Sequence, residues 1–234
     1  MSITKKGLDY KDFMECDAKD DLNGFVKTYM FLKGLALGCE LQQTTIALSL
    51  AKRLHSNQVR KDGSPYLLHP LKVASTLVSL GIRDDITLSA ALLHDTLEDC
   101  SDQLPAHGRE FITDFGLDEE VLSIVELLTK ESGLNNEELA VYFIKISESE
   151  KASLIKLADR QHNSSTLYAF TPEKMRSYIE ETKRFILPLA SYCKAYYPDM
   201  NSQFTILKSA IYSMNHLMEV MLNNIMTLGS KIGE

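Results

Sequence analysis

The segment 91–100, which reads ALLHDTLEDC, carries a histidine and three acids directly after a run of apolar residues. Buried charges are costly unless they are paired or bind a metal ion. On a helix His94 and Asp95 lie roughly 100° apart, and Glu98 follows one turn later on the same side. A metal ion held by His94 and Asp95 would leave a metal-bound water close to Glu98. The segment therefore offers a candidate metal site beside a carboxylate that can act on a metal-bound water.

A catalytic metal needs ligands from further helices, and two other helix-like segments offer them. His55 ends LAKRLH, and Asp159 lies within LIKLADRQHN, each after an apolar run. Two imidazoles and two carboxylates without a thiolate favour Mn²⁺ or Fe²⁺, with Zn²⁺ as an alternative. A structural interpretation also exists, with His55 as a C-terminal helix cation and Asp159 paired with Arg160. Spacing alone leaves both interpretations open.

The segments that position these residues are helical almost throughout. Glycine and proline are sparse, at 11 and 6 in 234 residues, which disfavours many short strands. Pro70 and Gly81 mark the start and end of one helix, and the two acids at 84–85 begin another that continues to 99. Pro188 is expected to kink or break the helix that begins at Thr171. We predict an all-α bundle of roughly eight to ten helices.

Composition narrows the classes of function and partner. The formal net charge is −7, which argues against a non-specific nucleic-acid binder. The four cysteines are far apart and form no C-x-x-C pair, as expected in a reducing compartment. The N-terminus lacks the apolar core of a signal peptide, and no apolar stretch is long enough to span a bilayer. We expect a cytoplasmic protein without a nucleic-acid or membrane partner.

Four blocks of the chain, in order, resemble the hydrolase domain of the RelA/SpoT alarmone family, part of the HD superfamily of metal phosphohydrolases. They are RKDGSPYLLHPLKVA (60–74), AALLHDTLED (90–99), IKLADRQHNSSTL (155–167) and EETKRFILPLA (180–190). The resemblance covers about residues 40–195. It implies an all-α HD-domain fold and hydrolysis of the 3′-pyrophosphate of (p)ppGpp to GDP or GTP and pyrophosphate, usually with Mn²⁺.

The resemblance also implies a role for each matching position. Four residues would bind the metal ion: His55, His94, Asp95 and Asp159. Two acids would position and activate the attacking water: Glu98 and Asp99. Six residues would contact the nucleotide, guanosine tetra- or pentaphosphate: Arg60, Lys61, Lys156, Arg160, Asn163 and Thr166. Tyr66 and His69 also match the family, and we expect them mainly to shape the scaffold.

The third block departs from the family's common form, RLHNMRTL. Gln161 stands in place of Leu, and Ser164 and Ser165 replace Met and Arg. The loss of a cation leaves the preference among ppGpp, pppGpp and an adenosine analogue open. An HD phosphohydrolase acting on another nucleotide, such as the 2′-phosphate of NADPH, is the alternative enzyme. A non-catalytic alarmone-binding regulator is the alternative of a different class.

We expect three segments along the chain. These are a helical N-terminal extension (1–38), the HD hydrolase domain (39–196) and a C-terminal amphipathic helix (197–234). The last carries an apolar seam with alternating spacings of four and three: Met200, Phe204, Leu207, Ile211, Met214, Met218, Met221, Ile225 and Leu228. The seam packs either on the bundle or on a second subunit, as in a homodimer. Because the chain stops at Glu234, before a synthetase domain, a stand-alone hydrolase is expected.

Overall fold

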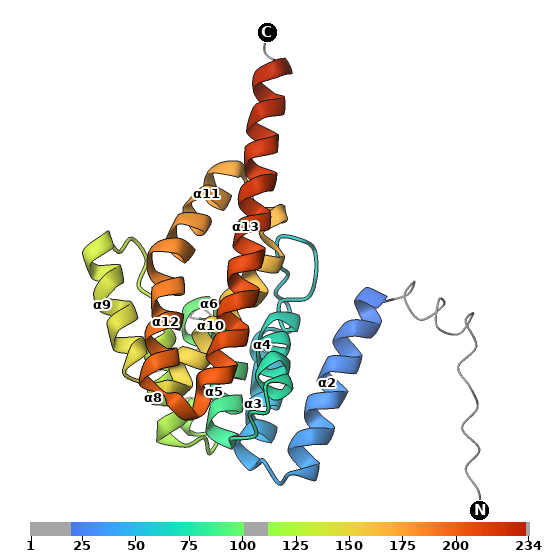
Figure 1. Ribbon diagram of the computed structural model, residues 1–234. Coiled ribbons are helices and arrows are strands. Elements are labelled where there is room, and N and C mark those ends of the chain that lie inside the picture. The colour runs from blue at the N-terminus through green and yellow to red at the C-terminus, as the bar shows by residue number, and fades with distance from the viewer. Residues whose placement is uncertain (1–19, 101–111, 233–234) are drawn as a thin grey trace, which may run out of the picture.

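The computed structural model describes residues 20–100 and 112–232, and these ranges form helices without a β-strand (Figure 1). The predicted all-α bundle is thereby confirmed. The α-helices are α2 (Asp20–Gly38), α3 (Gln42–Leu54), α4 (Leu68–Ser79), α5 (Asp85–Leu93), α6 (Thr96–Asp99), α8 (Glu119–Leu128), α9 (Asn136–Ser147), α10 (Glu150–Ser165), α11 (Pro172–Glu181), α12 (Leu187–Tyr196) and α13 (Asn201–Ile232). Two single 3₁₀ turns, η1 (Leu167–Ala169) and η3 (Pro198–Met200), and a π-helix, η2 (Thr182–Ile186), connect the later helices.

Polar side chains fix where several helices begin. Asp84 accepts a hydrogen bond from Thr87 N and so caps α5, and Asp118 does the same for α8 through Glu120 N. Asn135 forms a reciprocal capping box with Glu138 at the start of α9. These bonds satisfy amide groups that a helix leaves without partners at its first turn.

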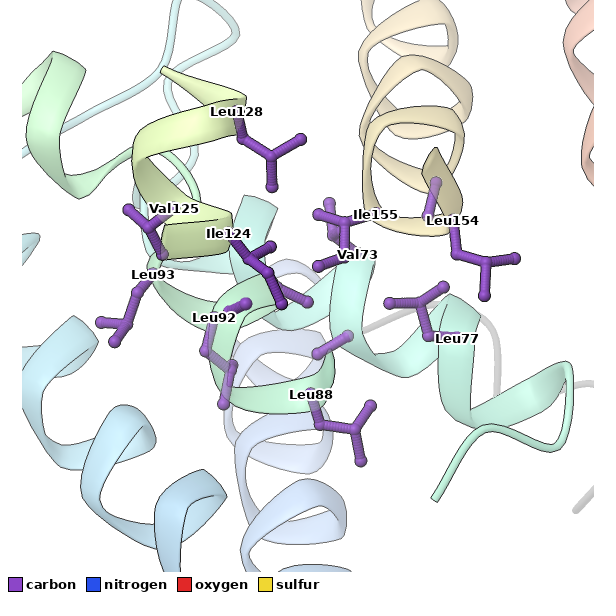
Figure 2. Close-up of a cluster of buried hydrophobic side chains, with 14 of the residues drawn as sticks. Val73, Leu77, Leu88, Leu92, Leu93, Ile124, Val125, Leu128, Leu154 and Ile155 are labelled. Carbon is purple, nitrogen blue, oxygen red and sulfur yellow. The ribbon is translucent and has the colours of Figure 1, made fainter. Parts of the chain in front are cut away.

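The main core lies where α4, α5, α8 and α10 meet. Their apolar side chains point toward one another in Figure 2, and among the labelled residues are Val73, Leu77, Leu88, Leu92, Ile124, Val125, Leu154 and Ile155. The last residue of α5 and the middle of α10 are both fully buried in this core. The packing therefore brings the end of α5, the start of α4 and the middle of α10 to one place.

The continuous helix predicted over 84–99 is wrong. It ends at Leu93, and α6 begins at Thr96, so His94 and Asp95 lie in the break between two helices. Thr96 Oγ1 donates to Leu93 O at 2.6 Å, and His94 Nδ1 lies 2.8 Å from Ala91 O. These side-chain bonds occupy carbonyl groups that the next helical turn would use. The break turns both side chains toward α4 and α10.

The helix that contains Pro188 is not a continuous α-helix, because the π-helix η2 separates α11 from α12. The backbone runs from α11 through the π-helix η2 into α12 with helical dihedral angles at Thr182, Ile186 and Leu187. Proline has no amide hydrogen and clashes with the carbonyl group four residues earlier. A π-turn widens the helix just before Pro188 and relieves that clash.

The C-terminal helix α13 runs along the whole bundle, and its last turns extend beyond the other helices (Figure 1). Phe204, Leu207 and Ile211 are buried in the main core, whereas Met218 and Leu222 pack in a second apolar cluster with residues of η1 and α11. Of the expected N-terminal extension, α2 covers residues 20–38, and residues 1–19 lie outside the described ranges. None of the described helices combines the length and apolar character that crossing a membrane requires.

Candidate active site

Four side chains from three parts of the bundle converge at the break between α5 and α6. Nε2 of His69, in the first turn of α4, lies 3.1 Å from Nε2 of His94. The same His69 atom is 3.2 Å from Asp95 Oδ2 and 3.2 Å from Asp159 Oδ1 on α10. His94 Nε2 lies 3.2 Å from Asp95 Oδ1 and 3.8 Å from Asp159 Oδ1. Two imidazole nitrogens and two carboxylates therefore face one point, buried at the end of the main core.

The donor atoms in this cluster suit a divalent metal ion. His69, His94 and Asp95 offer ligand atoms within 4.8 Å of one another. His94 Nδ1 faces the carbonyl oxygen of Ala91, which can only accept, so Nδ1 carries a hydrogen and Nε2 points to the cluster, where a metal ion would take the place of a proton. Two histidine nitrogens facing each other beside two carboxylates form a mixed N,O ligand set, which divalent ions of intermediate hardness prefer.

The charges of the cluster depend strongly on one another. Burial alone would lower the pKa of His94, but the carboxylates of Asp95 and Asp159 outweigh it and raise the pKa to about 10. Burial would raise the pKa of Asp159, whereas Lys156 and the two histidines hold it well below the usual range. Both aspartates are therefore ionised and ready to neutralise a bound cation.

His55, which the sequence analysis expected among the ligands, lies close enough to His94, Asp95 and Asp99 for their charges to act on its ring, and His69 joins the cluster as a histidine that the analysis assigned to the scaffold. His55 caps the end of α3 and is buried, but its Nδ1 bonds Gln58 Oε1 at 2.6 Å, and its ring stacks on Tyr66 with centroids 4.8 Å apart. Its Nε2 has no hydrogen-bond partner in the described ranges. Helical spacing could have identified His69, because it shares a face of α4 with the buried Val73.

The predicted acidic pair lies on α6 at the edge of this cluster. Glu98 and Asp99 are exposed, in contrast to the four converging residues. The hydroxyl group of Tyr66 bonds both Asp95, at 2.8 Å, and Asp99. Glu98 accepts a bond from the backbone amide of Lys130 at 3.3 Å, and although the residue as a whole is exposed, partial removal of its carboxyl group from water raises its pKa. A raised pKa makes Glu98 a better proton acceptor than an ordinary glutamate.

The loop between α3 and α4, which carries Arg60 and Lys61, reaches the C-terminal end of α10. Arg60 donates to Asn163 Oδ1 at 2.8 Å and to Thr166 Oγ1 at 3.3 Å, so three predicted substrate residues lie together. Lys61 lies over the ring of Phe170, with Nζ 4.6 Å from the centroid. Gly63, at φ +86°, provides the turn that bends the loop back on itself.

Two further predicted substrate residues, Lys156 and Arg160, form ion pairs with acidic side chains of the protein. Lys156 Nζ lies 3.3 Å from Asp159 Oδ2 in a largely buried pair. Arg160 is buried, pairs with Glu181, and donates to Thr182 Oγ1 at 3.2 Å. Its guanidinium lies 4.0 Å from the centroid of the Tyr178 ring. Arg160 therefore ties α10 to α11 and η2, while Lys156 stays beside the cluster.

Two cavities meet at the cluster. One, of about 340 Å³, is lined by Arg60, Lys61, Asn163, Thr166, Phe170 and Lys174 among others. The other, of about 350 Å³, is lined by Glu98, Lys130, Lys156, Arg160 and Tyr178 among others. Five residues line both: Tyr66, Asp95, Asp99, Asn163 and Lys174. An elongated anionic ligand could occupy both cavities and pass Asp95, which lines both, and Asp159, which lines the second.

The family follows from a comparison of the chain with family models. The HD domain model matches residues 47–192, a range that contains every residue of the cluster. The chain belongs to the HD domain family. Members of this family bind a divalent metal, in agreement with the ligand set at His69, His94, Asp95 and Asp159.

Three similar proteins add detail to this assignment. A guanosine-3′,5′-bis(diphosphate) 3′-pyrophosphohydrolase of Aquifex aeolicus is 40% identical over 149 residues, covering 62% of this chain and 20% of that protein. A probable GTP pyrophosphokinase of Mycobacterium leprae is 36% identical over 144 residues, covering 62% and 18%. This chain thus spans about a fifth of the curated relatives' length. A solved structure described as a metazoan ortholog of SpoT that hydrolyses ppGpp matches with a TM-score of 0.59 and 24% identity, covering 75% of this chain and 95% of that one.

Proposed function

We propose that this chain hydrolyses the 3′-pyrophosphate of (p)ppGpp to GDP or GTP and pyrophosphate, with Mn²⁺ as its metal. The observation that carries the proposal is the convergence of His69, His94, Asp95 and Asp159 between two cavities with basic residues. The relatives named as (p)ppGpp hydrolases or pyrophosphokinases support the choice of nucleotide. The proposed ligand set keeps His55, whose buried Nε2 has no hydrogen-bond partner in the described ranges, and adds His69, which lies beside the other three residues.

The two cavities suggest how the substrate lies. The nucleoside and its 5′-phosphates would occupy the cavity lined by Arg60, Lys61, Phe170 and Lys174. The guanidinium group of Arg60 and the ammonium groups of the two lysines would neutralise the negative charge of the phosphates there. The 3′-pyrophosphate would extend past the cluster toward Lys130 and Lys156. Asn163, which bonds both Arg60 and Asp159, would link the nucleoside side to the reacting side.

In the proposed reaction, water attacks the phosphorus atom bound to the ribose 3′-oxygen, and the bond between this oxygen and phosphorus breaks. A bound divalent ion would lower the pKa of the attacking water and neutralise charge on the phosphoryl group. Glu98 would accept the proton of the water, while Asp99 helps to orient it. The 3′-oxygen takes up a proton from solvent and leaves as a hydroxyl group, and the pyrophosphate, which now carries the oxygen of the attacking water, departs.

A nucleotide panel tests this proposal directly. Purified protein with Mn²⁺ is incubated with ppGpp, pppGpp, an adenosine analogue and NADPH, and every phosphorus-containing product is identified. We expect pyrophosphate from ppGpp or pppGpp. Orthophosphate from NADPH alone would support the alternative enzyme, and tight binding of ppGpp without any product would support the non-catalytic regulator.

The proposed roles of the acids are separated by two substitutions. Glu98→Gln retains size but cannot accept the proton, so kcat should fall by about 10²–10⁴-fold while Mn²⁺ still binds. Asp95→Ala should abolish both Mn²⁺ binding and turnover, with helicity by circular dichroism largely unchanged. Full kcat in Glu98→Gln at saturating substrate would remove Glu98 from the mechanism.

From its composition, we also propose that the protein is cytoplasmic. A further proposal is that α13 pairs with a second copy of the chain. Between Lys208 and Lys231 this helix carries one charged residue, Glu219, which Lys183 already pairs. Leu217 and Met226 are 56% and 50% exposed on it. Light scattering of the native chain and of Leu217→Glu tests the pairing. A monomeric mass for the native protein would contradict it.

A further inference from the structure

The loop that follows α3 contacts the backbone of the acidic pair. Nε2 of Gln58 donates to the carbonyl oxygen of Asp99 at 2.7 Å, and its Oε1 lies 2.6 Å from Nδ1 of His55. A backbone carbonyl group only accepts, so the amide nitrogen must face Asp99 and the amide oxygen must face His55. The Nδ1–H of His55 is then the donor, and it holds the amide of Gln58 in this one orientation.

α6 requires an external contact of this kind. It has four residues, and a helix of one turn is not stable by itself. The carbonyl groups of its last turn have no partners within the helix. Gln58, 41 residues earlier in the chain, supplies a partner for the carbonyl group of Asp99.

The same loop also holds the side chain of Asp99. The His55 ring stacks on the Tyr66 ring at an interplanar angle of 20°, and the Tyr66 hydroxyl group bonds Asp99 and Asp95. Tyr66 N donates to Gln58 O at 2.9 Å, so both contacts with Asp99 come from one closed loop. Gln58 fixes the backbone of Asp99, and Tyr66 fixes its carboxylate.

We propose that Gln58, oriented by His55, is a positioning residue that sets where the Asp99 carboxylate lies relative to the attacked phosphoryl group. This inference rests on the proposed function, because that function gives Asp99 its catalytic part. Gln58 is absent from the residues that line the two cavities at the described site and from the proposed metal ligands. It therefore acts through Asp99, and neither the substrate nor the metal ion contacts it.

A double-mutant cycle tests the proposal. Gln58→Glu preserves the acceptor for His55 but removes the donor for the Asp99 carbonyl, so kcat on ppGpp should fall by about 10²-fold. KM and the Kd for Mn²⁺ should change by less than about twofold. In the Asp99→Asn background the same substitution should change kcat by less than about threefold, because the carboxylate that it positions is gone. Asn57→Ala, at the exposed neighbouring position, is the matched control and should retain kcat.

Two results would overturn the proposal. One is an equal loss of kcat in both backgrounds, and the other is a loss explained by a higher KM or a weaker Kd for Mn²⁺. Hydrogen exchange provides a readout that does not depend on the reaction. The amides of Asp99 and Cys100 bond within α6 and should exchange faster in Gln58→Glu than in Asn57→Ala. If the native chain fails to hydrolyse ppGpp, the proposed function fails, and unchanged exchange would separately refute the role of Gln58.

Discussion

At the scale of single residues, His162 lies behind a proposed metal ligand. Its Nδ1 is 2.8 Å from Nδ1 of His69, whose other nitrogen faces the cluster. One of the two Nδ1 atoms must donate to the other. If His69 donates, its Nε2 keeps the lone pair that a metal ion requires. Partners of this kind orient metal-binding histidines and increase their affinity for the ion.

Replacing His162 should therefore weaken metal binding without removing a ligand. We expect His162→Leu to raise the Kd for Mn²⁺ by about 10–100-fold, measured by titration with detection of free Mn²⁺ by electron paramagnetic resonance. His216→Leu, a matched change at an exposed position of α13, should leave the Kd unchanged. Equal affinities of the two variants would show that His162 does not orient His69.

At the scale of helices, α3 depends on a cap from another helix. Leu41, at its N-cap position, provides no side-chain hydrogen bond. Instead, the carboxylate of Asp85 on α5 accepts from Gln43 N at 2.9 Å, Thr44 N at 2.7 Å and Thr44 Oγ1 at 2.6 Å. An acid at this end also complements the helix dipole. α3 therefore begins where α5 packs against it.

Loss of this tertiary cap should destabilise the fold. Asp85→Ala should lower the free energy of unfolding by about 2 kcal/mol, the upper part of the range for capping residues, because three bonds are lost. Asp118→Ala, which removes the single local cap of α8, should cost about 1 kcal/mol or less. Urea unfolding monitored by circular dichroism measures both. A smaller cost for Asp85→Ala than for Asp118→Ala would contradict this account.

At the scale of the whole molecule, α13 completes the main core. Phe204 is fully buried and its ring stacks with that of Tyr197, with centroids 6.0 Å apart. Leu207 and Ile211 extend the same buried face. The helix that the sequence analysis separated at residue 197 therefore packs on α10 and α12. α13 therefore stabilises the bundle that holds the site.

Shortening a buried side chain near the start of α13 should therefore destabilise the entire domain. Phe204→Ala should cost about 3–5 kcal/mol of unfolding free energy. Ile206→Ala, two residues away and 55% exposed before the change, should cost less than about 0.5 kcal/mol. Chemical unfolding curves of the two variants provide the comparison. Similar costs would mean that α13 is not part of the cooperative core.

The sequence by itself determined the helical class and the family. Apolar spacing and capping residues indicated the helices, since both depend on nearby residues. The ordered blocks around His94, Asp95 and Asp159 indicated the HD domain. These three residues do converge in the structure, although their metal-binding role stays a prediction. The roles of Glu98 and Asp99 also stay predictions.

Only the tertiary structure showed that His69 lies with them. His55 and His69 flank the same loop, and the interpretation of both as ends of helices was open from sequence. The position of His69 depends on how α4 crosses the break between α5 and α6, which places His69 over His94, while His55 stacks on Tyr66 and bonds Gln58. That crossing results from side chains packing among α4, α5 and α10, and α10 is distant in the chain from the other two helices. Spacing along a sequence fixes the face of one helix, whereas the meeting of two faces depends on the packing of the whole core.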